Sequence, residues 1–315
     1  ASQAAATSAL THARQRLPQT VLEELAAQAC ARAAQGATAT WRRLRLRALD
    51  ATTVSMAREP ELFQHFGAHR ARTTAVRYPL ATFACLLELA TGLILDYGFG
   101  PFDPGEKNTA TPLLRSLAEG DLLLADRGFA GSPFLARIRQ TGAHFLMRKQ
   151  ACLKPQKLPV LQRLGREDFL SELPMSKPAR RKDPSLPQTV RVRLFRVRWR
   201  TPAGERLDQW FVTSLEDARR FKKATLARLY HRRWQMETAY QEFKLTLHTD
   251  VLRSKTVANV YKEFAAHVLA YLLLRLLMAE AARKHRKKPT AISLLATARW
   301  VTDFSRRMAY APTWL

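Results

Sequence analysis

The spacing of apolar residues predicts helices and strands that alternate through the first half of the chain. Between Pro18 and Ala34, apolar residues recur at helical spacing. From Trp41 to Asp50, apolar residues alternate with arginines, which is the period of a strand with Asp50 at its end. Further strands are predicted at 75–89, 92–99, 122–125 and 144–148, and helices at 109–118 and 133–140. This β-β-β-α-β-α-β order predicts a mixed α/β fold.

The pattern changes after about residue 150. Pro, Lys and Arg accumulate, and apolar residues alternate with arginines at 190–200, followed by a predicted turn at 201–205 and a return strand at 209–215. From 216 to 286 the pattern is helical almost throughout. We therefore expect a β-rich insertion with a basic face, followed by a helical part that completes the core.

These patterns divide the chain into five expected parts. They are a helical N-terminal segment (1–40), the first part of the core (41–149), the basic insertion (150–215), the helical second part of the core (216–285) and a helical C-terminal tail (286–315). The chain starts without Met and ends on an aromatic segment, so we expect a fragment trimmed at one or both ends.

The charge balance points to a polyanionic partner. Lys and Arg number 52 and Asp and Glu 26, which gives a formal net charge of +26. Nucleic acid is the leading candidate and an anionic membrane surface the weaker one. A hydrophobic fraction of 47% excludes a disordered basic tail. The most apolar stretch, 264–279, carries His267 and Arg275 and is too short to cross a bilayer, so a buried helix is expected and no membrane.

Three widely spaced cysteines indicate the compartment. Their odd number and the lack of a Cys-x-x-Cys motif argue against a disulfide scaffold and a zinc ribbon. No secretory signal precedes the first predicted helix. A reducing cytoplasm fits these features.

One segment carries the most chemistry, Tyr230 to Lys244. At about 100° per residue on a continuous helix, Arg233, Glu237 and Lys244 fall within roughly 60° of Tyr230, and apolar residues line the opposite side. Such a face suits a metal-binding carboxylate flanked by groups that hold DNA phosphates. The alternative is an ordinary solvated face with an Arg233–Glu237 ion pair.

Two aspartates strengthen the metal interpretation. Asp50 and Asp126 each follow a short apolar strand, where an aspartate can project into a cleft. Together with Glu237 they suit a site for two Mg²⁺ ions roughly 3.5–4 Å apart that supports phosphoryl transfer. A lone aspartate at a strand end is more often a turn or helix cap.

The segment Tyr230–Lys244 contains Y-x2-R-x3-E-x6-K, and in this motif the chain resembles bacterial DDE transposases of the insertion-sequence-4 family. Asp126 in Leu-Leu-Ala-Asp-Arg-Gly-Phe and Asp50 in Leu-Asp-Ala-Thr-Thr are similar to that family's two aspartate segments. Ala51 stands where the family usually has glycine. The resemblance runs from about residue 13 to 300.

The resemblance implies a fold and an activity. The fold is an RNase H-like mixed sheet flanked by helices, with a β-rich insertion before the helix that carries the catalytic Glu and a helical C-terminal part. Asp50, Asp126 and Glu237 would bind two Mg²⁺ ions, with Mn²⁺ as a substitute. The enzyme would cleave transposon ends, form a DNA hairpin and join the ends to target DNA. The 1–40 segment would be the remnant of a longer DNA-binding region.

The resemblance also implies DNA contacts and partners. Tyr230, Arg233 and Lys244 would hold phosphates around a flipped base, and Trp210 lies near the position of a base-stacking Trp, although a core Trp on a hairpin is an equal alternative. The strand arginines Arg191, Arg193 and Arg198 are interpreted as non-specific phosphate contacts. The partners would be double-stranded DNA, as terminal inverted repeats and as target, and a second copy of the chain. The location would be the cytoplasm, at the nucleoid.

Two alternatives belong to other functional classes. One is a catalytically silent DNA-binding protein descended from a transposase, which Ala51 and the apparent truncation favour and the three carboxylates disfavour. The other is a basic RNA-associated protein that uses its charge alone. Metal-dependent DNA cleavage that disappears with Glu237→Gln would separate the enzyme from the silent protein. Equal affinity for RNA and DNA, unaffected by Asp50→Asn or by Mg²⁺, would favour the RNA-associated protein.

Overall fold

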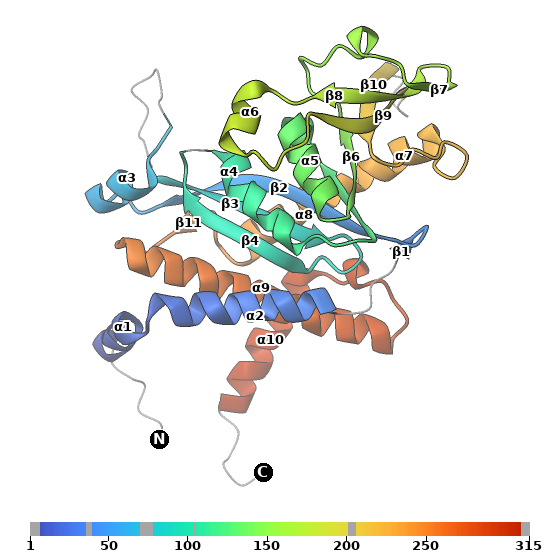
Figure 1. Ribbon diagram of the computed structural model, residues 1–315. Coiled ribbons are helices and arrows are strands. Elements are labelled where there is room, and N and C mark those ends of the chain that lie inside the picture. The colour runs from blue at the N-terminus through green and yellow to red at the C-terminus, as the bar shows by residue number, and fades with distance from the viewer. Residues whose placement is uncertain (1–6, 36–39, 70–77, 104, 201–205, 310–315) are drawn as a thin grey trace.

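A computed structural model describes residues 7–35, 40–69, 78–103, 105–200 and 206–309 (Figure 1). The turn predicted at 201–205 and the first residues of the strand predicted at 75–89 lie outside this part of the chain. The strands are β1 (Thr40–Trp41), β2 (Leu44–Met56), β3 (Leu80–Glu88), β4 (Ile94–Pro101), β5 (Asp121–Ala125), β6 (His144–Arg148), β7 (Gln162–Gly165), β8 (Asp168–Pro174), β9 (Thr189–Arg200), β10 (Arg206–Thr213) and β11 (Val251–Leu252). They form one sheet.

The order of the strands identifies the core. The sheet runs β4-β3-β2-β5-β6, then β10-β9-β8-β7. The pairs β4–β3 and β3–β2 are antiparallel, whereas β2–β5 and β5–β6 are parallel. Three antiparallel strands followed by two parallel ones make an RNase H-like mixed sheet, which confirms the predicted fold class.

Helices cover both faces of this sheet. They are α1 (Thr7–Arg16), α2 (Gln19–Gln35), α3 (Pro60–Phe66), α4 (Glu106–Ala110), α5 (Ser132–Gln140), α6 (Lys177–Lys182), α7 (Lys223–Tyr230), α8 (Gln235–Gln241), α9 (Val257–Lys284) and α10 (Leu294–Ala309). On β4, Phe99 stacks on Phe264 of α9 with ring centroids 3.8 Å apart. A Cβ atom at the neighbouring Gly98 would lie 2.8 Å from the Thr109 carbonyl oxygen of α4. Because side chains alternate along a strand, α4 and α9 cover opposite faces.

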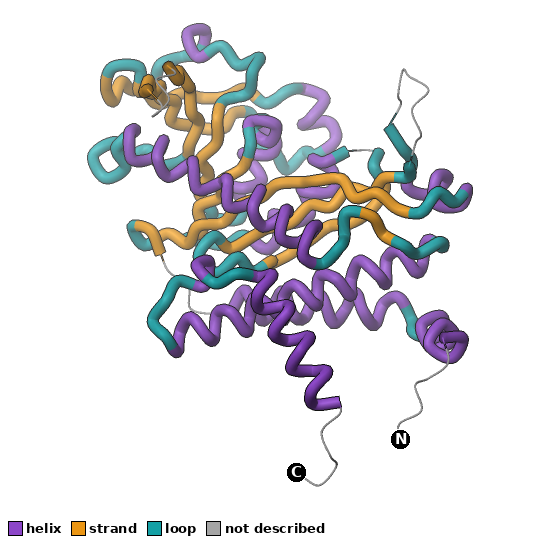
Figure 2. The backbone as a smooth tube through the Cα atoms, turned by 180° about the vertical axis from the view of Figure 1, so that it is seen from behind, coloured by secondary structure: helices purple, strands orange, loops and turns teal. Residues whose placement is uncertain are grey.

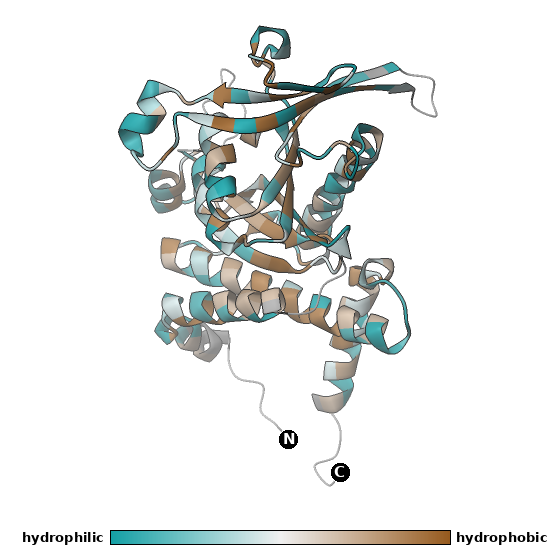
Figure 3. Ribbon diagram, turned by 45° about the vertical axis from the view of Figure 1, so that its right-hand side comes forward, coloured by the Kyte–Doolittle hydropathy of each residue, from teal (hydrophilic) through white to brown (hydrophobic). Residues whose placement is uncertain are grey.

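The helix α9 lies beside α2 beneath the sheet, and α10 projects away from the body (Figures 1 and 2). By length and composition α9 could cross a membrane, but 44% of its most apolar window is buried inside the protein. Its buried residues include Phe264, Tyr271 and Arg275. The hydrophobic colour is most continuous in the central strands of the sheet, while the helices have mixed colours (Figure 3). One side of α9 thus packs against the rest of the protein.

The expected insertion continues the core sheet, because β10 pairs with β6 on one side and with β9 on the other. The prediction of a single basic face on β9 was wrong. Arg191 and Arg193 have odd numbers and Arg196 and Arg198 even ones, so the two pairs point to opposite faces of a strand with a period of two. The alternation of apolar residues and arginines is interrupted at Leu194-Phe195, two adjacent apolar residues that are both buried.

Two local predictions differ from the structure in their geometry. The segment expected to be one helix is divided: α7 ends at Tyr230, a 3₁₀ turn spans His231–Trp234, and α8 passes into a π-helical turn at Glu242–Thr246. Such changes of winding shift the angular positions of Tyr230 and Lys244 from those of a regular helix. The helix predicted at 109–118 consists of α4 and a 3₁₀ turn, Thr111–Ser116.

Candidate active site

Asp50 and Asp126 lie at neighbouring positions on adjacent strands. Asp50 lies inside β2 and not at its end as predicted, because the β-branched residues after it continue the strand and pair with β3 as far as Ser55. The parallel ladder between β2 and β5 stops at Leu49 and Ala125, the residues immediately before the two aspartates. Both carboxylates therefore project where β5 ends and its neighbour β2 continues.

Helix α8 brings Glu237 to the same place. The Tyr240 hydroxyl donates a hydrogen bond of 2.6 Å to the backbone oxygen of Asp50, which fixes α8 against β2. Tyr240 is buried, as its place on the apolar side of the predicted helix indicated. Glu237 lies one turn earlier on α8, with its side chain 40% exposed.

Arg233 connects two of the three carboxylates. Its Nη1 atom lies 3.4 Å from Oδ2 of Asp50, and its Nη2 atom lies 3.1 Å from Oε1 of Glu237. The ion pair with Glu237 is the one expected on an ordinary solvated helix face. The contact with Asp50 shows that the guanidinium also reaches the sheet. Arg233 is almost completely buried, and its Nε atom has no hydrogen-bond partner among the described residues.

Arg148 completes the site, and sequence reasoning missed it. Ala125 pairs with Met147 in the parallel ladder of β5 and β6, so the next residues, Asp126 and Arg148, are neighbours. Nη2 of Arg148 lies 2.6 Å from Oδ1 of Asp126, and its Nε atom is buried without a partner in the described structure. The sequence shows a basic residue at the end of the predicted strand 144–148. Only the order of the strands shows that this residue lies beside Asp126.

The two aspartates have opposite pKa shifts. Burial raises the pKa of Asp50 to about 6, against the lowering effects of the Ala51 N–H and Arg233, while Glu106 and Asp126 raise it further. Burial also acts to raise the pKa of Asp126, but the hydrogen bonds from Arg148 and the Arg127 N–H outweigh it and lower that pKa. The Asp126 carboxylate is therefore stabilised in its charged form by Arg148, whereas the nearby positive charge does not outweigh the burial of the Asp50 carboxylate.

This difference predicts how Asp50→Asn changes stability in metal-free buffer. A carboxyl group whose folded pKa is raised destabilises the fold once it ionises, so stability falls as pH rises from about 4 through 6. With a folded pKa of about 6 against the ordinary 3.8, the loss of folding free energy is up to roughly 3 kcal/mol. The Asn variant should match wild type at pH 4 and be more stable at pH 8, as urea unfolding would show. Asp126→Asn, the matched control, should have the opposite sign at pH 8 because its pKa is lowered.

Lys244 and Tyr230, the other two predicted DNA contacts of the motif, lie in different surroundings. Nζ of Lys244 donates a 2.7 Å hydrogen bond to Oγ1 of Thr52, two residues after Asp50 on β2. Tyr230 is buried, and its hydroxyl donates to the carbonyl oxygen of Ala125 at 3.3 Å. Lys244 thus lies beside the carboxylates with its side chain half-buried, while the Tyr230 phenol supports the end of β5.

The insertion residues lie farther along the sheet. Trp210 is half-buried on β10, edge-to-face with Phe169, and the Arg196 guanidinium lies 5.9 Å from its ring centre. Arg191 is exposed and paired with Glu216 at 2.9 Å, and Arg198 is exposed and paired with Glu167 at 2.6 Å. The expectation that Arg193 contacts DNA is wrong: its side chain is fully buried and paired with Asp168, because the backbone at Leu215 and Phe221, to whose oxygens it donates, covers this part of β9.

The donor groups suit a hard divalent cation. Asp50, Asp126 and Glu237 supply only carboxylate oxygens, the ligands that Mg²⁺ and Mn²⁺ prefer. As they stand, no three His, Cys, Asp or Glu side chains of the described residues are close enough together to hold a metal. Instead Arg233 and Arg148 contact the three carboxylates. The donor chemistry fits the cation, which would take over charge compensation that Arg233 now provides.

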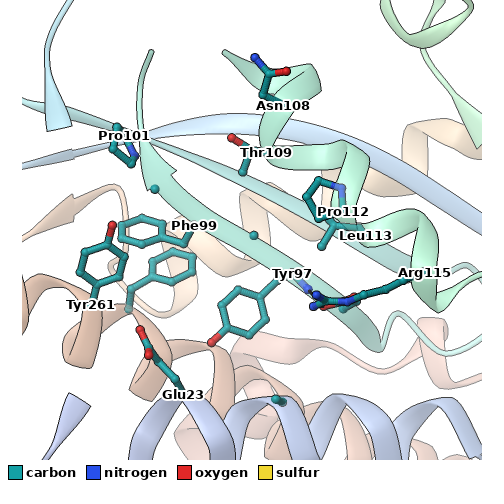
Figure 4. Close-up of a pocket in the computed structure, with 15 residues that line it drawn as sticks. Glu23, Tyr97, Phe99, Pro101, Asn108, Thr109, Pro112, Leu113, Arg115 and Tyr261 are labelled. Carbon is teal, nitrogen blue, oxygen red and sulfur yellow. Dashed lines mark hydrogen bonds and ion pairs between the residues drawn. The ribbon is translucent and has the colours of Figure 1, made fainter. Parts of the chain in front are cut away.

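A separate hollow of about 530 Å³ lies at the edge strand β4, with Tyr97 and Phe99 of β4, Tyr261 of α9 and Glu23 of α2 around it (Figure 4). None of the three carboxylates lines this hollow. Burial, followed by the charges of Cys30, Glu23 and Asp96, raises the pKa of Tyr97. The hollow is therefore distinct from the candidate active site.

Comparison with known proteins identifies the family. Residues 41–273 match the family described as "Transposase DDE domain". The chain is 30% identical over 248 residues to transposase InsG for insertion sequence element IS4 of Escherichia coli strain K12, a match that covers 77% of this chain and 54% of that protein. The chain thus spans about half the length of this curated relative.

A solved structure also aligns with the chain, the piggyBac transposase in its synaptic complex with hairpin DNA. Its TM-score is 0.49 at 8% identity, and the alignment covers 85% of this chain and 55% of that one. The family match covers Asp50, Asp126 and Glu237 together with the whole candidate site. The chain belongs to the IS4 family of transposases that carry a DDE domain.

Proposed function

We propose that the chain is the catalytic part of a DNA transposase that cleaves transposon ends and joins them to target DNA in a metal-dependent reaction. The observation that carries the proposal is the convergence of Asp50, Asp126 and Glu237 around Arg233 and Arg148. These carboxylates come from β2, the end of β5 and α8, which lie far apart in the sequence. Family membership supports the same activity.

We assign the metal to the three carboxylates, with two Mg²⁺ ions per site. When bound, these ions would activate a water or a 3′-hydroxyl and stabilise the leaving oxygen. Before they bind, Arg233 holds Asp50 and Glu237 and Arg148 holds Asp126, which limits repulsion among the carboxylates.

The same arginines are suited to bind a DNA phosphate. Their Nη atoms contact the carboxylates at the centre of the site, and their buried Nε atoms have no hydrogen-bond partner among the described residues. Guanidinium groups bind phosphate through two parallel hydrogen bonds. Lys244, beside Thr52, supplies a further positive charge on the same side of β2. These groups would orient the scissile phosphate against the carboxylates.

We further propose a cut-and-paste reaction through a DNA hairpin. Hairpin formation requires a base to leave the stack, and an aromatic side chain can offset the lost stacking. Trp210 is half-buried on β10, while Tyr230 positions the end of β5 from within the core. Trp210 is therefore assigned to stacking and Tyr230 to support of Asp126.

A homodimer on DNA is the assembly that we propose, because two transposon ends require two active sites. Helix α10 supports it by exposing Trp300, Phe304 and Met308, with the first two rings stacked at 5.3 Å. The same helix carries Asp303 near Arg306, so that two antiparallel copies could pair opposite charges. We place the protein in the cytoplasm, at the nucleoid.

The test is cleavage of a labelled duplex that carries the element's own ends, in Mg²⁺, Mn²⁺ or EDTA. Wild type is expected to cut at the junction only with metal, and a slowly migrating product would show the hairpin. Asp126→Asn is the inactive control. DNA binding without cleavage in any metal would contradict the enzyme proposal and favour a silent DNA-binding protein.

A further inference from the structure

The turn between β1 and β2 holds two arginines in a strained backbone conformation. Trp41 pairs with Leu44, which leaves Arg42 and Arg43 as a two-residue hairpin loop. Their φ angles are 51° and 67°, in the left-handed region. Turns of this kind favour Asn-Gly, because side chains of L-residues are strained at positive φ. The chain thus places two exposed cations where the backbone alone would favour other residues.

A second basic segment packs against this turn. Nη1 of Arg42 donates a hydrogen bond to the backbone oxygen of Arg220, and Nη2 of Arg220 donates one of 3.1 Å to the backbone oxygen of Arg42. The rings of Trp41 and Phe221 lie beneath, 6.0 Å apart. The Arg42 guanidinium lies 5.5 Å from the Trp41 ring centre, and that of Arg220 lies 4.9 Å from the Phe221 ring centre. These contacts hold like charges side by side.

The resulting group of exposed cations forms no side-chain ion pair with the part of the chain that the structure describes. We call it the basic corner, and it consists of Arg42, Arg43, Arg219, Arg220 and Lys222. None of these five forms an ion pair with a carboxylate of the described residues, whereas Arg191 and Arg198 on the neighbouring strand do. Asp217 is the adjacent acid, and it accepts the backbone N–H groups of Arg219 and Arg220 at 2.8 and 3.0 Å. Five positive charges beside one carboxylate leave the basic corner with a net positive charge, and a polyanion would relieve the remaining repulsion.

We propose that the basic corner binds the phosphate backbone of a DNA duplex at a point separate from the catalytic carboxylates. The identification of the polyanion as DNA rests on the proposed function. Leu44, which follows Arg43, begins the strand and precedes Asp50 by six residues, which corresponds to about 20 Å. That distance spans about six base pairs of B-form DNA. A duplex held at the carboxylates is long enough to reach the basic corner, which fixes its direction without reading its sequence.

The double variant Arg42→Asn/Arg43→Gly tests this role, because it removes both charges and installs the residues that the turn favours. Its melting temperature should rise by about 2 °C or more as the strain is relieved. Its affinity for a labelled 30-base-pair duplex of arbitrary sequence should fall about tenfold at 0.1 M salt, and the slope of log K against log salt should decrease by about two. A residue pair with only a structural role would not lose binding while gaining stability.

The matched control removes two exposed arginines from helix α6, as Arg180→Ala/Arg181→Ala, and should leave the salt slope unchanged. Arg219→Gln tests the other segment, with a slope lower by about one. An unchanged slope in both basic-corner variants would overturn the inference while the proposed function stands. Absence of duplex binding by wild type would overturn both.

Discussion

Glu237→Gln is expected to lower the rate of DNA cleavage by about a thousandfold or more, which corresponds to about 4 kcal/mol of lost transition-state stabilisation. The amide keeps the size of the side chain and an oxygen that can accept from Arg233, so the fold should be unaffected. What it removes is one negative charge from the group that would hold the metal. Single-turnover cleavage at saturating enzyme measures the rate, and a thermal melt in EDTA confirms the fold.

Glu216→Gln is the matched control for this experiment. Its side chain is 39% exposed, against 40% for Glu237, and each carboxylate accepts from one arginine. Glu216 pairs with Arg191 at the insertion, away from Asp50 and Asp126. Cleavage by this variant should stay within about twofold of wild type. Equal losses in the two variants would mean that Glu237 acts through general charge and not as a metal ligand.

Much of the core could be predicted because the residues that are apolar in the sequence pattern are also the buried ones in the core strands. The strands before Asp126 and at 144–148 are short apolar runs, and they form β5 and β6 at the centre of the sheet. The apolar residues around Tyr240 indicated the buried side of α8 correctly. The motif and the two aspartates predicted a site of three carboxylates, and the structure places them beside Arg233 and Arg148, although Asp50 lies within β2 and not at a strand end.

Strand order and burial of charged residues could not be predicted from local pattern. Alternation at 44–47 predicts a strand, but it does not show that β2 lies between β3 and β5 with both faces covered. Arg47 is consequently buried, with Glu88 at 2.7 Å and Asp121 at 2.9 Å. The partners come from β3 and β5, so only tertiary structure reveals them. Arg148 was missed for the same reason.

Arg193→Met is expected to reduce the free energy of unfolding by about 3–5 kcal/mol, the cost of breaking a buried ion pair by removing one partner. Its guanidinium donates two hydrogen bonds to Asp168, of 2.7 and 2.6 Å, and a third of 2.8 Å to the backbone oxygen of Phe221. Methionine would leave the Asp168 carboxylate buried and unpaired. The melting temperature should fall by roughly 6–15 °C, which differential scanning calorimetry would measure.

Two further variants show whether this loss of stability comes from the unpaired Asp168 carboxylate. Arg191→Met removes an arginine from the same strand whose side chain is 56% exposed, so the change should stay below about 1 kcal/mol. The double variant Arg193→Met/Asp168→Leu replaces both charges by apolar groups and should recover most of the lost stability, because no ion is then left without a partner. A double variant as unstable as the single one would show that the hydrogen bonds to the backbone matter more than the charge pair. If Arg193→Met reduced the free energy of unfolding no more than Arg191→Met, the Arg193 side chain would be accessible to solvent. Arg193 would then again be a candidate for contact with DNA phosphates.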